Sequence, residues 1–136
     1  MKIQPYLNFS GQCDEAFALY EKALGGQVLY RHTYGNSPMA ADVGADWADK
    51  MMHISMRVGD QMLLGCDAPP SHYSKPQGLR VNLDFDNVAE GERVFKALSE
   101  GGKVGTAFQE TFWAKGFAMF EDRFGTPWMI NVSKPM

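Results

Sequence analysis

The sequence lacks the features that mark membrane-spanning, secreted and nucleic-acid-binding proteins. No run of about 18 consecutive apolar residues is present, the length that a membrane-spanning helix needs. The start, Met1 to Pro5, has no apolar stretch of the kind found in signal peptides. There is no basic run or arginine-rich stripe, and the net charge is -3, so the electrostatic term that drives nucleic-acid binding has no evident source. We therefore expect a cytoplasmic protein that binds neither nucleic acid nor membrane.

Cysteine is also scarce. Cys13 and Cys66 are the only two, too few and too far apart for a zinc motif. A reducing compartment would keep both as thiols, and Cys13 falls on the apolar side of a predicted helix, where a small hydrophobic residue is needed. The chain of 136 residues is 45% hydrophobic, which is enough for a core without a disulfide or a structural metal.

What the chain does contain is an internal repeat. The first copy runs through Leu7-Asn8-Phe9, a helical pattern ending in Lys22-Ala23-Leu24, Gly25-Gly26, and Gly59 followed by Met62-Leu63-Leu64. The second runs, in the same order, through Leu83-Asp84-Phe85, Lys96-Ala97-Leu98, Gly101-Gly102, and Gly125 followed by Trp128-Met129-Ile130. The repeat predicts two similar modules, about 1–67 and 78–134, each with a strand, a helix and further strands. We expect them to form a single domain, joined by a proline-rich linker and facing each other across a cleft.

The local patterns place the elements. Alternation predicts strands over 3–9 and 79–85, and helical spacing predicts a helix from Cys13 to Leu24 that Gly25 or Gly26 ends. Asn87, with Glu90 three residues later, predicts the start of a second helix, whose buried stripe is Val88, Val94, Phe95 and Leu98. Further strands are expected over 27–34, 51–58, 61–66, 103–113, 117–121 and 127–133. Residues 35–50 show no clear period and are expected to form a mobile loop or lid that can close over a ligand.

Several runs of residues then carry a family resemblance. They are Pro5-Tyr6-Leu7, Asn8-Phe9-Ser10-Gly11, the segment from Gln109 to Phe117 and the segment from Phe124 to Asn131. With the paired modules, they make the whole chain resemble the vicinal oxygen chelate superfamily, which includes glyoxalase I, extradiol dioxygenases and bleomycin-resistance proteins, and within it the PhnB group. The resemblance implies an α+β fold of two βαβββ modules that form a cupped mixed β-sheet, and a homodimer.

The resemblance also allows the family's metal site to be tested. Metal-dependent members place one ligand on each of the first, fourth, fifth and eighth strands, and these positions fall here on Gln4, Leu64, Arg80 and Met129. Only Gln4 is an oxygen donor, whereas a divalent cation needs three or four good donors. No metal cofactor is therefore predicted. The alternative is a shifted metal site built from His32, His53, His72 and Glu110.

Two residues are candidates for chemistry without a metal. Arg80 can hold a carboxylate, phosphonate or phosphate by paired hydrogen bonds, and the alternative for it is an ion pair with Asp84. Glu110 lies between Phe108 and Phe112, where burial would raise its pKa toward that of a general base, and the alternative for it is a solvated side chain.

The sequence therefore predicts a metal-independent, small-molecule-binding protein whose ligand is anionic or aromatic. The predicted ligand-binding residues are Gln4, Tyr6, Asn8, His53, Arg80, Asn82, Trp113, Phe117 and Met129. The alternative is a lyase, isomerase or dioxygenase that uses the shifted metal site or Glu110 as base. A third possibility, a structural or protein-interaction module, predicts an apolar cup, against which the polar residues on the first and fifth strands argue.

Overall fold

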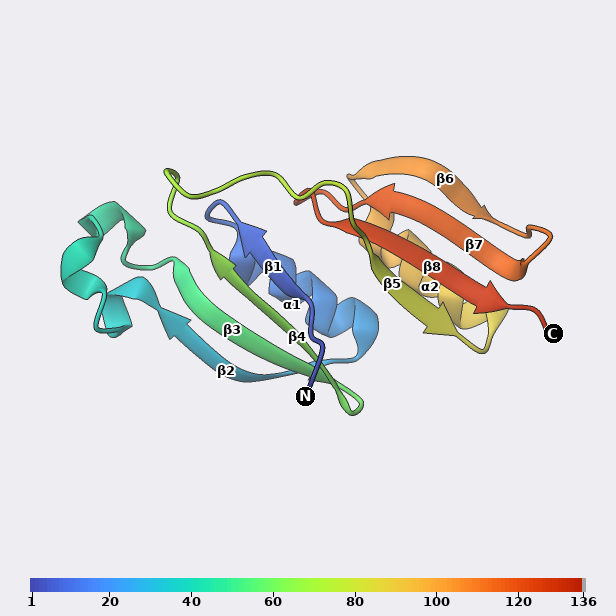
Figure 1. Ribbon diagram of the computed structural model, residues 1–136, viewed down its shortest axis with the longest axis horizontal. Helices are drawn as coiled ribbons and strands as arrows, with labels where there is room; N and C mark the ends of the chain where they lie inside the picture. Colours follow the sequence, from blue (N-terminus) through green and yellow to red (C-terminus); the bar gives the residue numbers. More distant parts are fainter. Residues whose placement is uncertain (136) are drawn as a thin grey trace. The chain divides into compact units, whose positions relative to one another are not determined.

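The computed structural model describes residues 1–135 and divides the chain into two compact units, one from Met1 to Lys75 and one that starts at Pro76 (Figure 1). In each unit a strand is followed by a helix and three more strands. Neither helix has the length and hydrophobicity that a crossing of the bilayer would require, among the residues described.

The first unit is a four-stranded mixed sheet with one helix on one side. Its elements are β1 (Tyr6–Phe9), α1 (Cys13–Leu24), β2 (Gln27–Thr33), β3 (Met51–Val58) and β4 (Gln61–Asp67). The strand order is β1-β4-β3-β2, with β1 parallel to β4 and the other pairs antiparallel.

The second unit repeats this topology. Its elements are β5 (Val81–Phe85), α2 (Val88–Ser99), β6 (Lys103–Gln109), β7 (Ala114–Glu121) and β8 (Pro127–Ser133). The strand order is β5-β8-β7-β6, and β5 is parallel to β8 as β1 is to β4. The predicted α+β fold of two βαβββ modules is confirmed, and each module forms its own four-stranded sheet.

Helix α1 has the bounds that its spacing predicts. Cys13, Phe17 and Tyr20 are buried, and the helix packs against β3 and β4. Gly65 on β4 allows this close packing, because a Cβ at that position would lie 2.6 Å from the Phe17 ring. Gly25 ends the helix in the left-handed conformation, with a φ of 68° that favours glycine.

Helix α2 begins as predicted, since the Asn87 side chain accepts a hydrogen bond from the Glu90 backbone nitrogen at 3.0 Å. Val94 and Leu98 are buried against the second sheet, whereas Val88 is exposed. The prediction that Val88 belongs to the buried stripe is therefore wrong: it is the first residue of the helix, and the buried stripe is formed by residues further along it.

Both first strands of the modules are shorter than predicted. β1 begins at Tyr6, and Ile3 is 91% exposed. Pro5 has no N–H, and its carbonyl accepts from the Leu64 nitrogen at 3.0 Å, after which regular pairing begins at Tyr6. β5 begins at Val81, so the exposed Leu79 lies outside the strand.

The segment 35–50 is a run of three short 3-10 turns, Tyr34–Asn36, Ala40–Asp42 and Ala45–Trp47. Its ends are tied together, because the Gly35 nitrogen donates to the Ala48 carbonyl at 2.8 Å. The buried Tyr34 hydroxyl also donates to the Asp67 carbonyl at 2.7 Å. Closure of this segment over a ligand stays a prediction.

Candidate functional site

The side of the first sheet opposite α1 carries most of the polar and aromatic strand residues of the first unit. Side chains alternate between the faces of a strand. Leu7 and Ile54 are buried on the helix side, while their neighbours Tyr6 and His53 lie on the other side. We call this side the first open face; it also carries Asn8, Tyr30, His32, Ser55, Arg57, Leu64 and Cys66.

A chain of hydrogen bonds crosses this face from β1 to β3. The Tyr6 hydroxyl lies 3.1 Å from His53 Nδ1, and His53 Nε2 lies 3.0 Å from Ser55 Oγ. His53 thus uses both ring nitrogens, one toward each hydroxyl. The strand order β1-β4-β3 brings Tyr6 and His53 together although 47 positions separate them in the sequence.

Aromatic side chains from β2 pack beside this chain. The Tyr30 ring centroid lies 5.8 Å from that of His53 and 5.4 Å from that of His32. The Tyr30 hydroxyl is also hydrogen-bonded to His32 Nδ1. In the strand register His32 is directly opposite His53, and Tyr30 is opposite Ser55. Two imidazoles and a phenol therefore share one patch of the sheet.

The thiol of Cys66 lies on the β1 side of the same patch. It donates to the Asn8 side-chain oxygen at 3.3 Å. Burial raises the pKa of Cys66 and of Tyr6, and the two groups lie close enough to influence each other. Both therefore stay protonated near neutral pH, and Cys66 is not an activated nucleophile.

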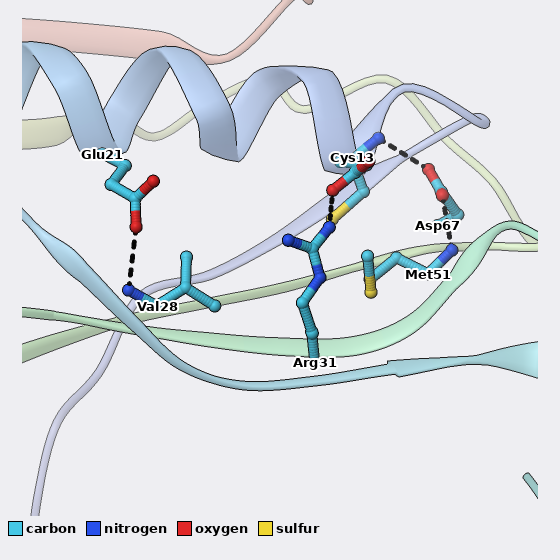
Figure 2. Close-up of polar contacts among 7 residues, drawn as sticks. Cys13, Glu21, Val28, Arg31, Met51 and Asp67 are labelled. Atoms are coloured by element: carbon cyan, nitrogen blue, oxygen red, sulfur yellow. Dashed lines mark hydrogen bonds and ion pairs between the residues drawn. The ribbon is translucent and has the colours of Figure 1, made fainter. Parts of the chain in front are cut away.

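The opposite side of the first sheet holds this arrangement in place (Figure 2). Asp67 is buried, and its carboxylate accepts from the Gly11 and Cys13 nitrogens at 2.8 and 3.0 Å and from the Met51 nitrogen at 2.9 Å. Arg31, whose side chain lies on the helix side in Figure 2, pairs with Asp14. These charged groups are structural and do not reach the first open face.

The corresponding side of the second sheet carries both polar and apolar side chains. In the register Asn82 lies opposite Met129, Met129 opposite Met119, and Phe117 opposite Asn131. Trp113 extends this surface, since its ring centroid is 5.1 Å from that of Phe117. We call the side of the sheet that carries these residues the second open face. Asn82, Met129, Phe117 and Trp113 are thus brought together within the second unit, and Tyr6, Asn8 and His53 within the first.

Arg80 lies just before β5 and bonds to the backbone. Its Nη1 donates to the carbonyls of Phe120 and Trp128 at 3.2 and 3.3 Å. Asp84 accepts instead from the Asn131 side chain at 3.1 Å. One nitrogen of Arg80 is thereby used to hold β7 and β8, and a role in anchoring a ligand would fall to its other nitrogens.

Glu110 is solvent-exposed, with 70% of its side chain accessible, and it forms an ion pair of 3.0 Å with Lys134. Phe112 beside it is also exposed. The burial that the general-base hypothesis requires is therefore not present around this carboxylate.

The family's metal positions do not provide a metal-binding set of donors. Gln4 precedes β1, Leu64 and Met129 place an alkyl chain and a thioether on the open faces, and Arg80 is a cation. Across residues 1–135 no group of three or more His, Cys, Asp or Glu side chains lies in a position to hold a metal ion. His72 bonds to Ser71 in the segment that follows β4, whereas His32 and His53 lie together on the first sheet.

Sequence reasoning missed Ser55, Tyr30 and Arg57 as parts of the candidate site. The polar residues His53, Ser55 and Arg57 alternate with buried ones in β3, and this period of two was the signal. Tyr30 was harder to find, because a register shift between Val28 and Tyr30 reverses the alternation of β2.

Comparisons with known proteins agree with this fold. The model of the Glyoxalase/Bleomycin resistance protein/Dioxygenase superfamily matches residues 2–130. Protein YjdN of Escherichia coli (strain K12) is 39% identical over 142 residues, which cover 98% of this chain and 97% of the relative.

Solved structures show the same architecture. Protein PA1353 from Pseudomonas aeruginosa is 44% identical, with a TM-score of 0.88 over 96% of each chain. A PhnB protein from Bacillus cereus has a TM-score of 0.80 at 19% identity, over 96% of this chain and 98% of its own, and this likeness concerns the fold alone.

Proposed function

The chain belongs to the Glyoxalase/Bleomycin resistance protein/Dioxygenase superfamily, and from this premise we propose that it is a metal-independent small-molecule-binding protein whose ligand lies on the first open face. Proteins of this superfamily bind small molecules. The class of ligand and the residues that bind it are inferred from the side chains on the sheet faces, and not from the fold.

The observation that carries the proposal is the hydrogen-bonded chain from Tyr6 through His53 to Ser55. A sheet face that needed only to pack would be stabilised by apolar side chains, because each polar group costs free energy when it is desolvated. This face instead combines hydroxyl and imidazole groups with the ring of Tyr30, which is 48% exposed. A few polar groups beside aromatic surface are typical of small-molecule sites.

We propose binding without a metal because the side chains at the family's metal positions are poor metal ligands. Hard and borderline divalent cations bind carboxylate, imidazole or several oxygen donors. The family's four positions offer a single carboxamide oxygen, that of Gln4. Imidazoles are present on the first open face, but His53 already uses both nitrogens toward Tyr6 and Ser55.

The second open face is a separate candidate surface within the second unit. Trp113 and Phe117 offer ring faces, Met129 an adaptable thioether, and Asn82 an amide. We propose that this surface, taken by itself, can bind a flat aromatic group. We also propose a homodimer, which sedimentation equilibrium of the purified chain would test.

Binding is tested with protein that has been stripped of metal by a chelator and verified by elemental analysis. A fragment library is screened by ligand-observed NMR against this protein and against the Tyr30→Ala and His53→Gln variants. His72→Gln is the matched control, because His72 lies outside both sheets. We expect hits that persist without metal, are lost in both face variants and are kept in the control. A set of hits that appears only after a divalent metal is added would overturn the proposal.

A further inference from the structure

We propose that Tyr6, His53 and Ser55 form an oxyanion-binding site on the first open face, in which His53 takes up a proton when a carboxylate or phosphonate group binds. This inference rests on the proposed function, because it names the ligand class and the proton coupling of the same face.

The charge on the first open face favours an anionic ligand. No strand position that the register of β1 to β4 places on it is acidic, within the part of the chain that the structure describes. Arg57 lies on it two positions after Ser55, and its guanidinium is held by the Gln27 side-chain oxygen at 3.1 Å. Among the strand residues of this face, an anion therefore meets a permanent cation and no carboxylate.

The groups next to His53 are Tyr6 from β1, His32 and Tyr30 from β2, and Ser55 along β3 itself. Cys66 and Arg57 lie on the same face. None of them is a carboxylate, so an imidazolium at His53 has no balancing charge until an anionic ligand arrives. Protonation of His53 and binding of an anion are therefore coupled, each favouring the other.

The protonation state of His53 decides how many hydroxyl hydrogens a ligand can use. A neutral imidazole has one N–H, so His53 donates to one of its two hydroxyl partners and accepts from the other. In either tautomer, one of the Tyr6 and Ser55 hydroxyl hydrogens is committed to His53 and the other is not. Protonated His53 donates to both oxygens, which frees both hydroxyl hydrogens for a ligand. An oxyanion that accepts from both of these hydroxyls thus requires the protonated ring.

The neighbouring side chains indicate the chemistry of the rest of the ligand. Tyr30 contacts the His53 ring, and Leu64 lies opposite both Tyr6 and Ser55 in the register. A flat apolar group next to the oxyanion would rest on these two side chains. Benzoate and phenylphosphonate are therefore suitable probes, and benzamide is their neutral counterpart.

The test is an NMR titration of the imidazole C2–H signals, of which the chain has three, from His32, His53 and His72. Each signal is assigned with a single His→Gln variant, and its pH titration is recorded without a probe and with each probe. We expect benzoate or phenylphosphonate to move the midpoint of the His53 titration to higher pH by about 1 unit, the effect of a neighbouring opposite charge. The His72 titration should not move.

Ser55→Ala keeps the His53 signal and removes one of the two donors. In this variant anion binding should weaken by about tenfold, the loss expected for one hydrogen bond to a charged group, and the movement of the His53 midpoint should shrink. The difference between the two acids tells whether the site prefers the planar carboxylate or the tetrahedral phosphonate.

Benzamide binding as tightly as benzoate, or anion binding that leaves the His53 titration unmoved, would overturn the inference while leaving the proposed function intact. A library screen that finds only neutral ligands on this face would do the same. Failure of all probes, together with a screen that yields no ligand for the first open face, would overturn both.

Discussion

The carboxylate of Asp67, at the end of β4, accepts a hydrogen bond from the backbone nitrogen of Cys13, the first residue of α1, at 3.0 Å. The side chain of Gln12, which precedes the helix, makes no capping hydrogen bond. A buried carboxylate from a distant strand therefore satisfies the helix start and places a negative charge at its positive end. Because the same carboxylate binds the Met51 nitrogen, it fixes α1 relative to β3.

Asp67→Asn should lower the free energy of unfolding by about 2–3 kcal/mol. The amide keeps the size of the carboxylate but has one acceptor oxygen, so buried backbone N–H groups lose their partner. Urea denaturation measures this loss. Asp60→Asn, in the exposed hairpin turn, is the matched control and should change stability by less than about 0.5 kcal/mol. Equal effects of the two substitutions would contradict the capping role.

Trp128 plays a comparable role in the second unit. It is fully buried, and its indole nitrogen donates to the Asp122 carboxylate at 2.9 Å. The same carboxylate also accepts from the Phe124 and Thr126 backbone nitrogens. Trp128→Phe should destabilise the protein by about 2–4 kcal/mol, through a cavity and the loss of the hydrogen bond from the indole nitrogen. Trp113→Phe, at a partly exposed site, should cost much less. The prediction fails if both variants have the same denaturation midpoint.

Glu110 should be dispensable for stability and for ligand binding on the first open face. It is exposed and paired with Lys134, and such surface ion pairs contribute about 0–1 kcal/mol. Glu110→Gln is therefore expected to keep both the denaturation midpoint and the affinity for any ligand found in the screen. Loss of turnover of an identified substrate in this variant, with affinity retained, would instead support a role of Glu110 as a general base.

The two cysteine thiols should make the free energy of unfolding depend on pH. Burial raises the pKa of Cys13 and of Cys66 in the folded protein, and for Cys13 the nearby Asp67 acts in the same direction. The folded state then binds more protons than the unfolded one once unfolded thiols ionise, above about pH 8.5. Their contribution is fully present below that pH, and the free energy of unfolding should fall as pH rises above it.

Urea denaturation at about pH 7 and at about pH 9.5 measures this fall. The variant Cys13→Ala cannot ionise at that position, so its stability should decrease less between the two pH values than that of the wild type. A decrease of the same size in the variant would show that Cys13 does not contribute to the pH dependence.

Much of the fold could be predicted from local patterns. The bounds of α1, the cap at Asn87 and the neighbouring strands predicted over 51–58 and 61–66 all depend on residues within a few positions of one another. The internal repeat predicted that the two modules share one topology, and β1 to β4 and β5 to β8 do have the same strand order. The strand starts were less predictable, since the pairing of Tyr6 with Leu64, not the alternation, decides where β1 begins.

The candidate site was predicted only in part, because it is built from contacts between distant strands. Tyr6, Asn8 and His53 were chosen as single residues, and nothing local indicates that Tyr6 and His53 share a hydrogen bond. The partners of Arg80 and Glu110 could not be predicted either. Arg80 bonds to backbone carbonyls of β7 and β8, and Glu110 pairs with Lys134, which is distant in the sequence.

The central claim is that the first open face binds a small molecule without a metal. It is tested most directly by measuring, with metal-stripped protein, the affinity for the strongest hit of the screen and mapping the shifted backbone amide signals, then repeating both after adding zinc, manganese or nickel. The account predicts the same affinity in every sample, with shifts at Tyr6, His53 and Ser55. Binding that depends on an added metal, or shifts that leave these three residues unmoved, would contradict it.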